Sequence, residues 1–415
     1  MLKTPKALRL HIGLYGRTNT GKSSFLNMLA NQDVAIISPV PGTTTDVVKK
    51  SMELLLIGPV MFLDTAGIDD TSELSDLRLK KTTKAYDSSD VFVLVMEADN
   101  WSEYEERIYQ EAKTRNIPLI VVVNKIDLKK PDNSLIEKLK GKTRHILKCS
   151  SVDEANRNRY VNEFKEMLLE ICPDEFLSPP LLIGDLLKPG DIAVLMVPID
   201  LQAPKGRLIL PQVQAIRDAL DNDAATLVVK EREFIHILDK LKEKPELVVC
   251  DSQVVQKMVA YTPPEIKTTT FSILFARFKG DLLEEAKGAA YIKKLKNGDK
   301  ILIAEACSHH ALEDDIGRVK IPRWLRQYVG GDLQIDVSTG RDYPDNLEEY
   351  KLVIHCGACM LTRREMLFRL HKAKEKGVPV TNYGVSIAFV QGVLERVLEP
   401  FPAALEAYKK VIEEL

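Results

Sequence analysis

The 415-residue sequence has little of what marks several protein classes: six cysteines, 6% aromatic residues and a net charge of −2. So few cysteines do not make a disulfide framework, and they fit a reducing compartment in which thiols serve metals or catalysis. The near-neutral charge gives no bulk attraction to nucleic acid. No apolar run approaches bilayer-spanning length, and residues 1–6 lack the apolar core of a signal peptide. We therefore expect a cytoplasmic protein with no nucleic-acid or membrane partner.

The length and punctuation of the chain indicate several domains. A chain of 415 residues exceeds one ordinary core, and 45% hydrophobic with 28% charged residues describes a soluble globular protein. Proline-containing stretches at 172–180 and 262–264 are typical of linkers. Strand-like runs alternate with helical patterns, which favours parallel sheets. We predict an α/β protein with domains at residues 1–175, 180–262 and 265–415, the last of them doubly wound.

The first domain opens with a phosphate-binding motif. Residues 16–23, Gly-Arg-Thr-Asn-Thr-Gly-Lys-Ser, follow a strand-like run and precede a helical pattern, which is the context that supports a Walker A motif. Its backbone N–H groups close around a phosphate, Lys22 neutralises the β- and γ-oxygens, and Ser23 binds Mg²⁺. An unrelated glycine turn is the alternative, and the flanking strand and helix disfavour it.

Four further motifs follow in the order that a GTPase needs. The loop at 41–46 offers a threonine to Mg²⁺ and the γ-phosphate, and the segment 64–67 offers Asp64 and the Gly67 N–H. Residues 124–127, Asn-Lys-Ile-Asp, select guanine, because the Asp127 carboxylate accepts from a donor pair that adenine lacks. Residues 149–151 offer a backbone N–H to guanine O6. We predict catalytic and Mg²⁺ contacts by Lys22, Ser23, Thr44, Asp64 and Gly67, and GTP or GDP contacts by Gly16, Asn19, Thr20, Gly21, Lys22, Ser23, Ser24, Asn124, Lys125, Asp127, Ser150 and Ser151.

These motifs resemble the translation-factor-like GTPases, within them the tRNA-modification and ribosome-assembly branch with a Pro-Gly-Thr-Thr switch, here at 41–44. Ile68 stands where Ras-like enzymes have a water-orienting glutamine. The resemblance implies that Asn19 coordinates K⁺ in place of an arginine finger, so hydrolysis should be slow and potassium-stimulated; a loop residue bonding its own backbone is the alternative. Residues 149–151, Cys-Ser-Ser, depart from the usual serine-alanine pair.

Other parts of the chain carry structural expectations. The charged helix around residues 104–107 should be only a solvated face. Residues 192–259 form a βα module with no grouping of His, Asp, Glu or Cys that suggests chemistry, and we expect a homodimer through it. Beyond the second linker we expect a strand at 270–276 and a helix at 281–296.

Three cysteines follow strand-like runs in the last third of the chain. Residues 352–354 lead into His-Cys-Gly-Ala-Cys at 355–359, and Thr362 with Glu365 begins a helix as a capping box. The run 300–306 leads into Cys307, with His309 and His310 beyond it. Because strand ends of a parallel sheet face one crevice, we expect the three thiols to meet around one metal, with a histidine as a further candidate. The residues alone leave zinc and iron–sulfur equally open.

Cysteine and histidine at 307 and 309 followed by the 355–359 motif, behind a GTPase domain, resemble the [FeFe]-hydrogenase maturation GTPase family, HydF. The resemblance implies that Cys307, Cys356 and Cys359 hold a [4Fe–4S] cluster, with His309, His355 and Asp314 as candidates for the fourth ligand or for donors to the sulfurs. It also implies a scaffold that builds the two-iron subcluster with radical-SAM maturases and delivers it to the apo-hydrogenase. The rival reading is a tRNA- or ribosome-directed GTPase with structural zinc, which the near-neutral charge disfavours.

Overall fold

The computed structural model describes residues 9–30, 48–54, 57–64, 83, 85–98, 101–173, 176, 180–197, 208–306, 315–340, 343–344, 346–359 and 361–415. The chain divides into two compact units, residues 1–179 and 180–415. Within the described ranges no helix is both long enough and apolar enough to cross a bilayer.

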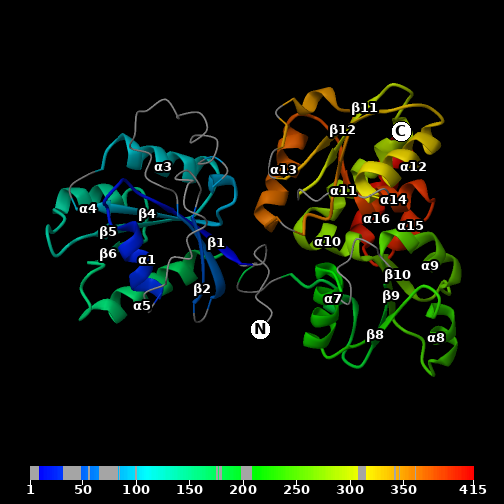
Figure 1. Cartoon of the computed structure of the whole chain (residues 1–415), viewed down its shortest axis with the longest axis horizontal. Helices are drawn as coiled ribbons and strands as arrows, with labels where there is room; N and C mark the ends of the chain where they lie inside the picture. The colour runs from blue at the N-terminus through cyan, green and yellow to red at the C-terminus, as the bar shows by residue number, and fades with distance from the viewer. Residues whose placement is uncertain are drawn as a thin grey trace. The chain divides into compact units, whose positions relative to one another are not determined.

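The first unit is built on a six-stranded sheet in the order β2-β3-β1-β4-β5-β6, parallel except for β2 (Figure 1). Its strands are β1 (Leu10–Tyr15), β2 (Val48–Leu54), β3 (Gly58–Asp64), β4 (Val91–Glu97), β5 (Leu119–Asn124) and β6 (Ile146–Lys148). The inner strands β1 and β5 are buried along their whole length, as strands covered on both faces must be.

Helices cover both faces of this sheet. They are α1 (Lys22–Ala30), α3 (Glu103–Thr114), α4 (Asn133–Lys140) and α5 (Arg157–Ile171). Alternate residues of β4 separate the two layers: Val91, Val93 and Val95 pack with α1 and α5, whereas Phe92, Leu94 and Met96 pack with α3 and α4. Phe25 of α1 and Phe164 of α5 meet edge to face at 5.3 Å.

The second unit contains two four-stranded parallel sheets. The first has the order β10-β9-β7-β8 and the second the order β12-β11-β13-β14. The strands are β7 (Ile192–Met196), β8 (Ala225–Val229), β9 (Leu247–Cys250), β10 (Lys267–Thr270), β11 (Lys300–Ala304), β12 (Gln334–Ser338), β13 (Leu352–His355) and β14 (Val380–Asn382). The helices are α7 (Leu210–Asp221), α8 (Phe234–Lys240), α9 (Val255–Tyr261), α10 (Phe271–Lys279), α11 (Leu282–Ala290), α12 (Ile321–Val329), α13 (Arg363–Glu375), α14 (Tyr383–Val390), α15 (Leu394–Leu398) and α16 (Pro402–Glu414).

The last sheet is doubly wound, as predicted. Leu302 and Val353 face the layer that contains α13, and Ile301 and Ile354 face the layer that contains α11 and α14. One continuous hydrophobic core runs from residue 182 to residue 408, so the two sheets of this unit share their interior. The expected α/β architecture, a P-loop domain followed by two parallel-sheet modules, is confirmed.

One expectation beyond the second linker is wrong, and a helix expected there is present but shorter. Residues 271–279 form helix α10 and not a strand, and β10, just before it, belongs to the first sheet of the unit. The run is apolar because α10 is buried on most sides, which hides helical periodicity. The Thr270 hydroxyl accepts a hydrogen bond from the Ile273 N–H at 3.2 Å and so marks the helix start. The helix expected at 281–296 ends at Ala290, where a 3₁₀ turn, Tyr291–Lys294, follows.

Candidate functional site

The phosphate-binding loop joins β1 to α1 as the motif predicts. Gly21 has φ +90°, and a Cβ there would lie 2.3 Å from Asn124 Nδ2, so only glycine fits. Asn19 is also left-handed, with φ 65°, and its side chain is exposed. Ser23 and Ser24 at the start of α1 are likewise exposed, whereas Thr20 is buried. The loop therefore holds the shape that lets its N–H groups surround a phosphate.

Lys22 lies over the beginning of this loop. Its Nζ donates to the carbonyl oxygens of Gly16 at 2.6 Å and Arg17 at 2.7 Å. Asp64 ends β3, the neighbour of β1, and burial raises the pKa of its carboxyl while the charges of Lys22 and Lys50 oppose that rise. The predicted phosphate lysine and Mg²⁺ carboxylate thus lie at one edge of the sheet.

Asn124 connects the guanine motif to the phosphate loop. It is 1% exposed; its Nδ2 donates to the Thr20 carbonyl at 3.0 Å, and its Oδ1 accepts from the Ser151 N–H at 3.0 Å and hydroxyl at 2.9 Å. Ser150 is buried beside it, and Asp127 is exposed. Asn124 and, through it, Ser151 are therefore held next to the loop. Thr44, Gly67 and Ile68 lie outside the described residues.

The expectation of a purely solvated face on the helix around residues 104–107 is wrong. Glu105 is 1% exposed and pairs with Arg17 of the phosphate loop at 2.8 Å. The Tyr104 hydroxyl accepts a hydrogen bond from the Gly16 N–H at 3.2 Å. The signal in the sequence was Ser102 followed three residues later by Glu105, a capping-box pattern that draws the glutamate inward.

The Cys356 and Cys359 thiols lie on the turn between β13 and α13, and both side chains are partly exposed. The predicted capping box at the start of α13 is present: the Thr362 side chain accepts from the Glu365 N–H, and the Glu365 carboxylate accepts from the Thr362 N–H at 2.9 Å. The cap at Thr362, three residues after Cys359, fixes where α13 begins and so limits how far the cysteine turn can move.

The end of β11 lies against this turn. The Ala306 N–H donates to Cys356 Sγ at 3.1 Å, and Ala304 is the register partner of His355. Cys307 is the next residue after Ala306, but residues 307–314, with Cys307, His309 and Asp314, lie outside the described part of the chain. Among the described residues no three His, Cys, Asp or Glu side chains group as a metal site. The contact between the Ala306 N–H and Cys356 Sγ fits the expected cluster, because hydrogen bonds from N–H groups to sulfur accompany cysteine ligation of iron.

His355 is fully buried behind the cysteine turn. Its Nε2 lies 3.0 Å from Nη1 of Arg369, and because arginine can only donate, Nε2 accepts. Nδ1 therefore carries the proton and donates to the Cys356 carbonyl at 3.0 Å. Burial, and next the charge of Arg369, lower the pKa of His355 to about 3, so the ring is neutral at pH 7. Both ring nitrogens are engaged with protein groups.

Lys279, at the end of α10, was not found from the sequence. It is 2% exposed, and its Nζ donates to the carbonyls of Leu361 at 2.6 Å and Cys359 at 3.4 Å. Burial lowers the pKa of Lys279 to about 8, opposed by Cys359 and Glu365. A buried cation thus lies directly beneath the two-cysteine turn, where thiolates or an anionic cluster would offset its burial.

Comparison with known families assigns most of the chain. Residues 182–280 match the family described as the hydrogen maturase F dimerization domain, and residues 283–400 match the hydrogen maturase F tetramerization domain. Residues 11–125 match the 50S ribosome-binding GTPase family.

Individual relatives resemble the first unit alone. The tRNA modification GTPase MnmE of Synechocystis sp. is 39% identical over 125 residues, 30% of this chain and 27% of that protein. MnmE of Trichormus variabilis is 40% identical over 134 residues, 31% of this chain and 27% of that protein. The chain thus spans about a quarter of the length of these relatives. A solved structure of Aquifex aeolicus Era bound to GDP·AlF₄⁻ is 23% identical, with a TM-score of 0.33, 55% of this chain and 97% of that chain covered.

Proposed function

This chain belongs to the hydrogen maturase F family, and on that premise we propose that it is the iron–sulfur scaffold of [FeFe]-hydrogenase maturation. Its N-terminal domain hydrolyses GTP with Mg²⁺. The proposal is that the C-terminal domain holds a [4Fe–4S] cluster, receives the two-iron subcluster with the help of radical-SAM maturases and delivers it to the apo-hydrogenase. We place this cycle in the cytoplasm, where thiols stay reduced.

The observation that carries the proposal is the approach of β11 to the cysteine turn. The Ala306 N–H reaches Cys356 Sγ at 3.1 Å, so the last described residue before position 307 lies against the cysteine turn. Cys307, Cys356 and Cys359 are therefore the proposed iron ligands. When bound, the cluster supplies an iron site that three cysteines leave free for a further ligand.

His355, His309 and Asp314 were candidates for that further ligand. His355 fits a different role, because Arg369 binds its Nε2 and its Nδ1 donates to the Cys356 carbonyl. We propose that it positions the cysteine turn, and that the remaining ligand comes from His309 or Asp314. The carbonyls of Cys359 and Leu361 hold the Lys279 ammonium group beneath the turn, and we propose that its positive charge balances the negative charge of the thiolates.

In the GTPase domain, Lys22 and a Mg²⁺ ion on Ser23, Thr44 and Asp64 would neutralise the phosphates. Asn19 is proposed to bind K⁺; its exposed, left-handed position in the loop supports this. Hydrolysis would then change the affinity for a partner protein, because loops ordered by the γ-phosphate are released afterwards.

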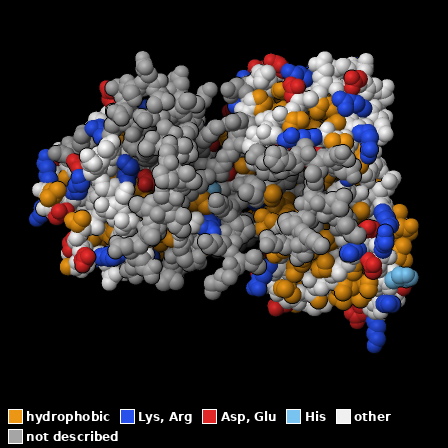
Figure 2. Space-filling view, in the orientation of Figure 1, with side chains coloured by type: hydrophobic (Ala, Val, Ile, Leu, Met, Phe, Trp, Pro, Cys, Tyr) orange, Lys and Arg blue, Asp and Glu red, His pale blue; other side chains and the backbone are white. Residues whose placement is uncertain are grey.

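A second copy of the chain is the proposed partner of the β8 edge. Among the described strands, in the order β10-β9-β7-β8, β8 lies at the edge of the sheet, and an edge strand can pair with a strand of another chain. Figure 2 shows hydrophobic side chains gathered over the part of the second unit that contains α7, β8 and α8. The exposed ones there include Val213, Leu220, Val228 and Ile235. Pairing of two β8 strands would cover this surface, in keeping with the dimerization family that residues 182–280 match.

The function is tested by transfer. Protein loaded by the maturases is mixed with purified apo-hydrogenase, and hydrogen evolution is measured. Wild type should activate the hydrogenase, whereas Cys356→Ser should not, although its GTP turnover stays within about twofold because the two sites lie on separate units. Cys250→Ser, at a buried cysteine in β9, is the matched control and should remain active. Full activation by Cys356→Ser would contradict the scaffold role.

The rival function, a tRNA- or ribosome-directed GTPase with zinc, gains no support from the relatives. The MnmE match covers 30% of this chain, so it concerns the GTPase domain alone. Residues 182–280 and 283–400 match families of hydrogen maturase F.

A further inference from the structure

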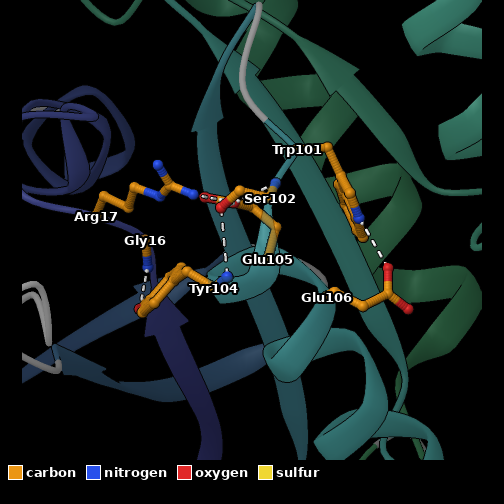
Figure 3. A network of polar contacts seen from close by, with 7 residues as sticks. All are labelled: Gly16, Arg17, Trp101, Ser102, Tyr104, Glu105 and Glu106. Carbon is orange, nitrogen blue, oxygen red and sulfur yellow. Dashed lines mark hydrogen bonds and ion pairs between the residues drawn. The ribbon is translucent and has the colours of Figure 1, made fainter.

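The first turn of α3 is tied to the beginning of the phosphate loop (Figure 3). The Gly16 N–H donates a hydrogen bond to the Tyr104 hydroxyl at 3.2 Å. Arg17 Nη2 donates to Glu105 Oε2 at 2.8 Å. Neither tyrosine nor glutamate belongs to the motifs that bind guanine, phosphate or Mg²⁺. Two adjacent residues of α3 therefore grip two adjacent residues of the loop.

Glu105 also serves a second purpose with the same oxygen atom. Oε2 accepts from the Ser102 N–H at 2.9 Å and the Ser102 hydroxyl at 3.0 Å, which completes the capping box of α3. The side chain is 1% exposed, and a carboxylate so buried needs its cation. Arg17 supplies it from the loop. The start of α3 and the start of the loop are consequently stabilised by one shared carboxylate.

Lys22 holds the same two loop residues from the other side. Its Nζ donates to the carbonyls of Gly16 and Arg17 at 2.6 and 2.7 Å. The carbonyl of Arg17 also accepts from the Thr20 hydroxyl at 3.0 Å. Gly16 is thus fixed at both its N–H and its carbonyl, and the peptide planes that follow it inherit their orientation from that anchor.

The far end of α3 is also anchored. Arg115, at its C-cap, pairs with Asp87 at 2.8 Å and lies over the Tyr86 ring at 5.7 Å. Asp87 and Tyr86 precede β4, on the chain segment that follows the Mg²⁺ carboxylate of β3. The helix is therefore held at one end by the phosphate loop and at the other by the segment leading into β4, which makes it a rigid support.

We propose that Glu105 and Tyr104 are positioning residues for binding the phosphates of GTP and GDP. They act through Arg17 and Gly16, and set the direction in which the phosphate-binding N–H groups point. Because the loop surrounds phosphates common to GDP and GTP, loosening it weakens ground-state and transition-state binding alike. KM should therefore rise while kcat changes little.

The decisive variant is Glu105→Gln, which keeps an oxygen to cap α3 but removes the charge that pairs with Arg17. We expect KM for GTP and Kd for a fluorescent GDP analogue to rise about tenfold, with kcat within about twofold. Glu106→Gln is the matched control, because Glu106 is the next residue and bonds to Trp101 and Lys142, away from the loop. It should change both constants by less than about twofold.

A double-mutant cycle separates positioning from general destabilisation. Glu105→Gln combined with Arg17→Gln should cost no more than the larger single change, whereas Glu106→Gln combined with Arg17→Gln should be additive. Tyr104→Phe removes one hydroxyl and tests the second contact; it should raise Kd for GDP at least threefold, and it decides the matter if Glu105→Gln does not fold. The proposal is overturned if Glu105→Gln and Tyr104→Phe bind GDP as tightly as wild type does. It is also overturned if their weaker GDP binding comes with a lowered unfolding temperature and Glu106→Gln shows the same two changes.

Discussion

Replacing Arg369 with methionine should weaken the C-terminal unit more than any loss of surface charge would. The side chain is 5% exposed and donates to His355 Nε2 at 3.0 Å and to the Gly340 carbonyl at 2.8 Å. Methionine fills similar space but donates nothing, so two acceptors are left without that donor. A buried acceptor such as His355 Nε2 costs about 1–3 kcal/mol when it is left unsatisfied, whereas the Gly340 carbonyl is only partly buried, so we predict a loss of about 1–3 kcal/mol in the free energy of unfolding.

The loss should not depend on pH between 6 and 8. Burial is the larger cause of the low pKa of His355, and Arg369 the smaller, so the ring stays neutral in this range with or without the arginine. If His355 became charged in the variant, the loss in the free energy of unfolding would instead shrink as the pH falls, since protonation would remove the unsatisfied acceptor at Nε2.

Urea unfolding of the iron-free protein measures this loss. The chain has two tryptophans, Trp101 in the first unit and Trp324 in the second, so a Trp101→Phe background reports on the second unit alone. His371→Ala on the same helix is the control; its side chain is 69% exposed, and the change should stay within about 0.5 kcal/mol. A loss for Arg369→Met no larger than that of the control would refute the role given to this contact.

Three further predictions concern packing, titration and assembly. Gly288→Ala should destabilise the protein by about 1–3 kcal/mol although alanine has the better helix propensity, because its Cβ would lie 1.9 Å from the Val380 carbonyl oxygen. Gly141→Ala is the control and should not destabilise, because the nearest atom to its Cβ is at 3.4 Å. An unfolding midpoint of Gly288→Ala equal to that of Gly141→Ala would contradict this prediction. Burial raises the pKa of Glu285 in the folded protein, so the stability that this residue confers is present below its unfolded pKa and is lost as the pH rises through its folded pKa. Wild type should therefore show urea midpoints that fall from pH 5 to 8, and Glu285→Gln should remove that fall. Parallel midpoint curves for the two proteins would contradict this prediction. Val228→Lys on the β8 edge should shift the protein toward monomers in sedimentation, and an unchanged dimer would exclude this edge.

The sequence predicted the elements that carry strong local signals. The strand-like run at 352–354 lies in β13 (Leu352–His355), and the capping box at Thr362 begins α13 as expected. The same kind of signal at Ser102 was present but overlooked, because a run of charged residues resembles a solvated face. Local sequence patterns thus predict a helix or strand when residues within a few positions in the chain determine where it begins and ends.

What the sequence could not predict depends on contacts between distant residues. Helix α10 was taken for a strand because burial on most sides removes its periodicity. Lys279 and Arg369 lie near the cysteine turn only through the packing of α10 and α13, and no spacing in the chain indicates either. The pairing of Arg17 with Glu105 joins residues 88 apart, so it too appears only in the folded protein.

We propose that Cys307, Cys356 and Cys359 together hold a [4Fe–4S] cluster. The most direct test of this proposal is iron and acid-labile sulfide quantification on anaerobically purified protein, with each cysteine changed to alanine in turn. We predict iron and sulfide in equal amounts in the wild type, near-complete loss of both in each of the three variants, and no loss in Cys250→Ala. Stoichiometric zinc without sulfide, or full iron retention in Cys307→Ala, would contradict it.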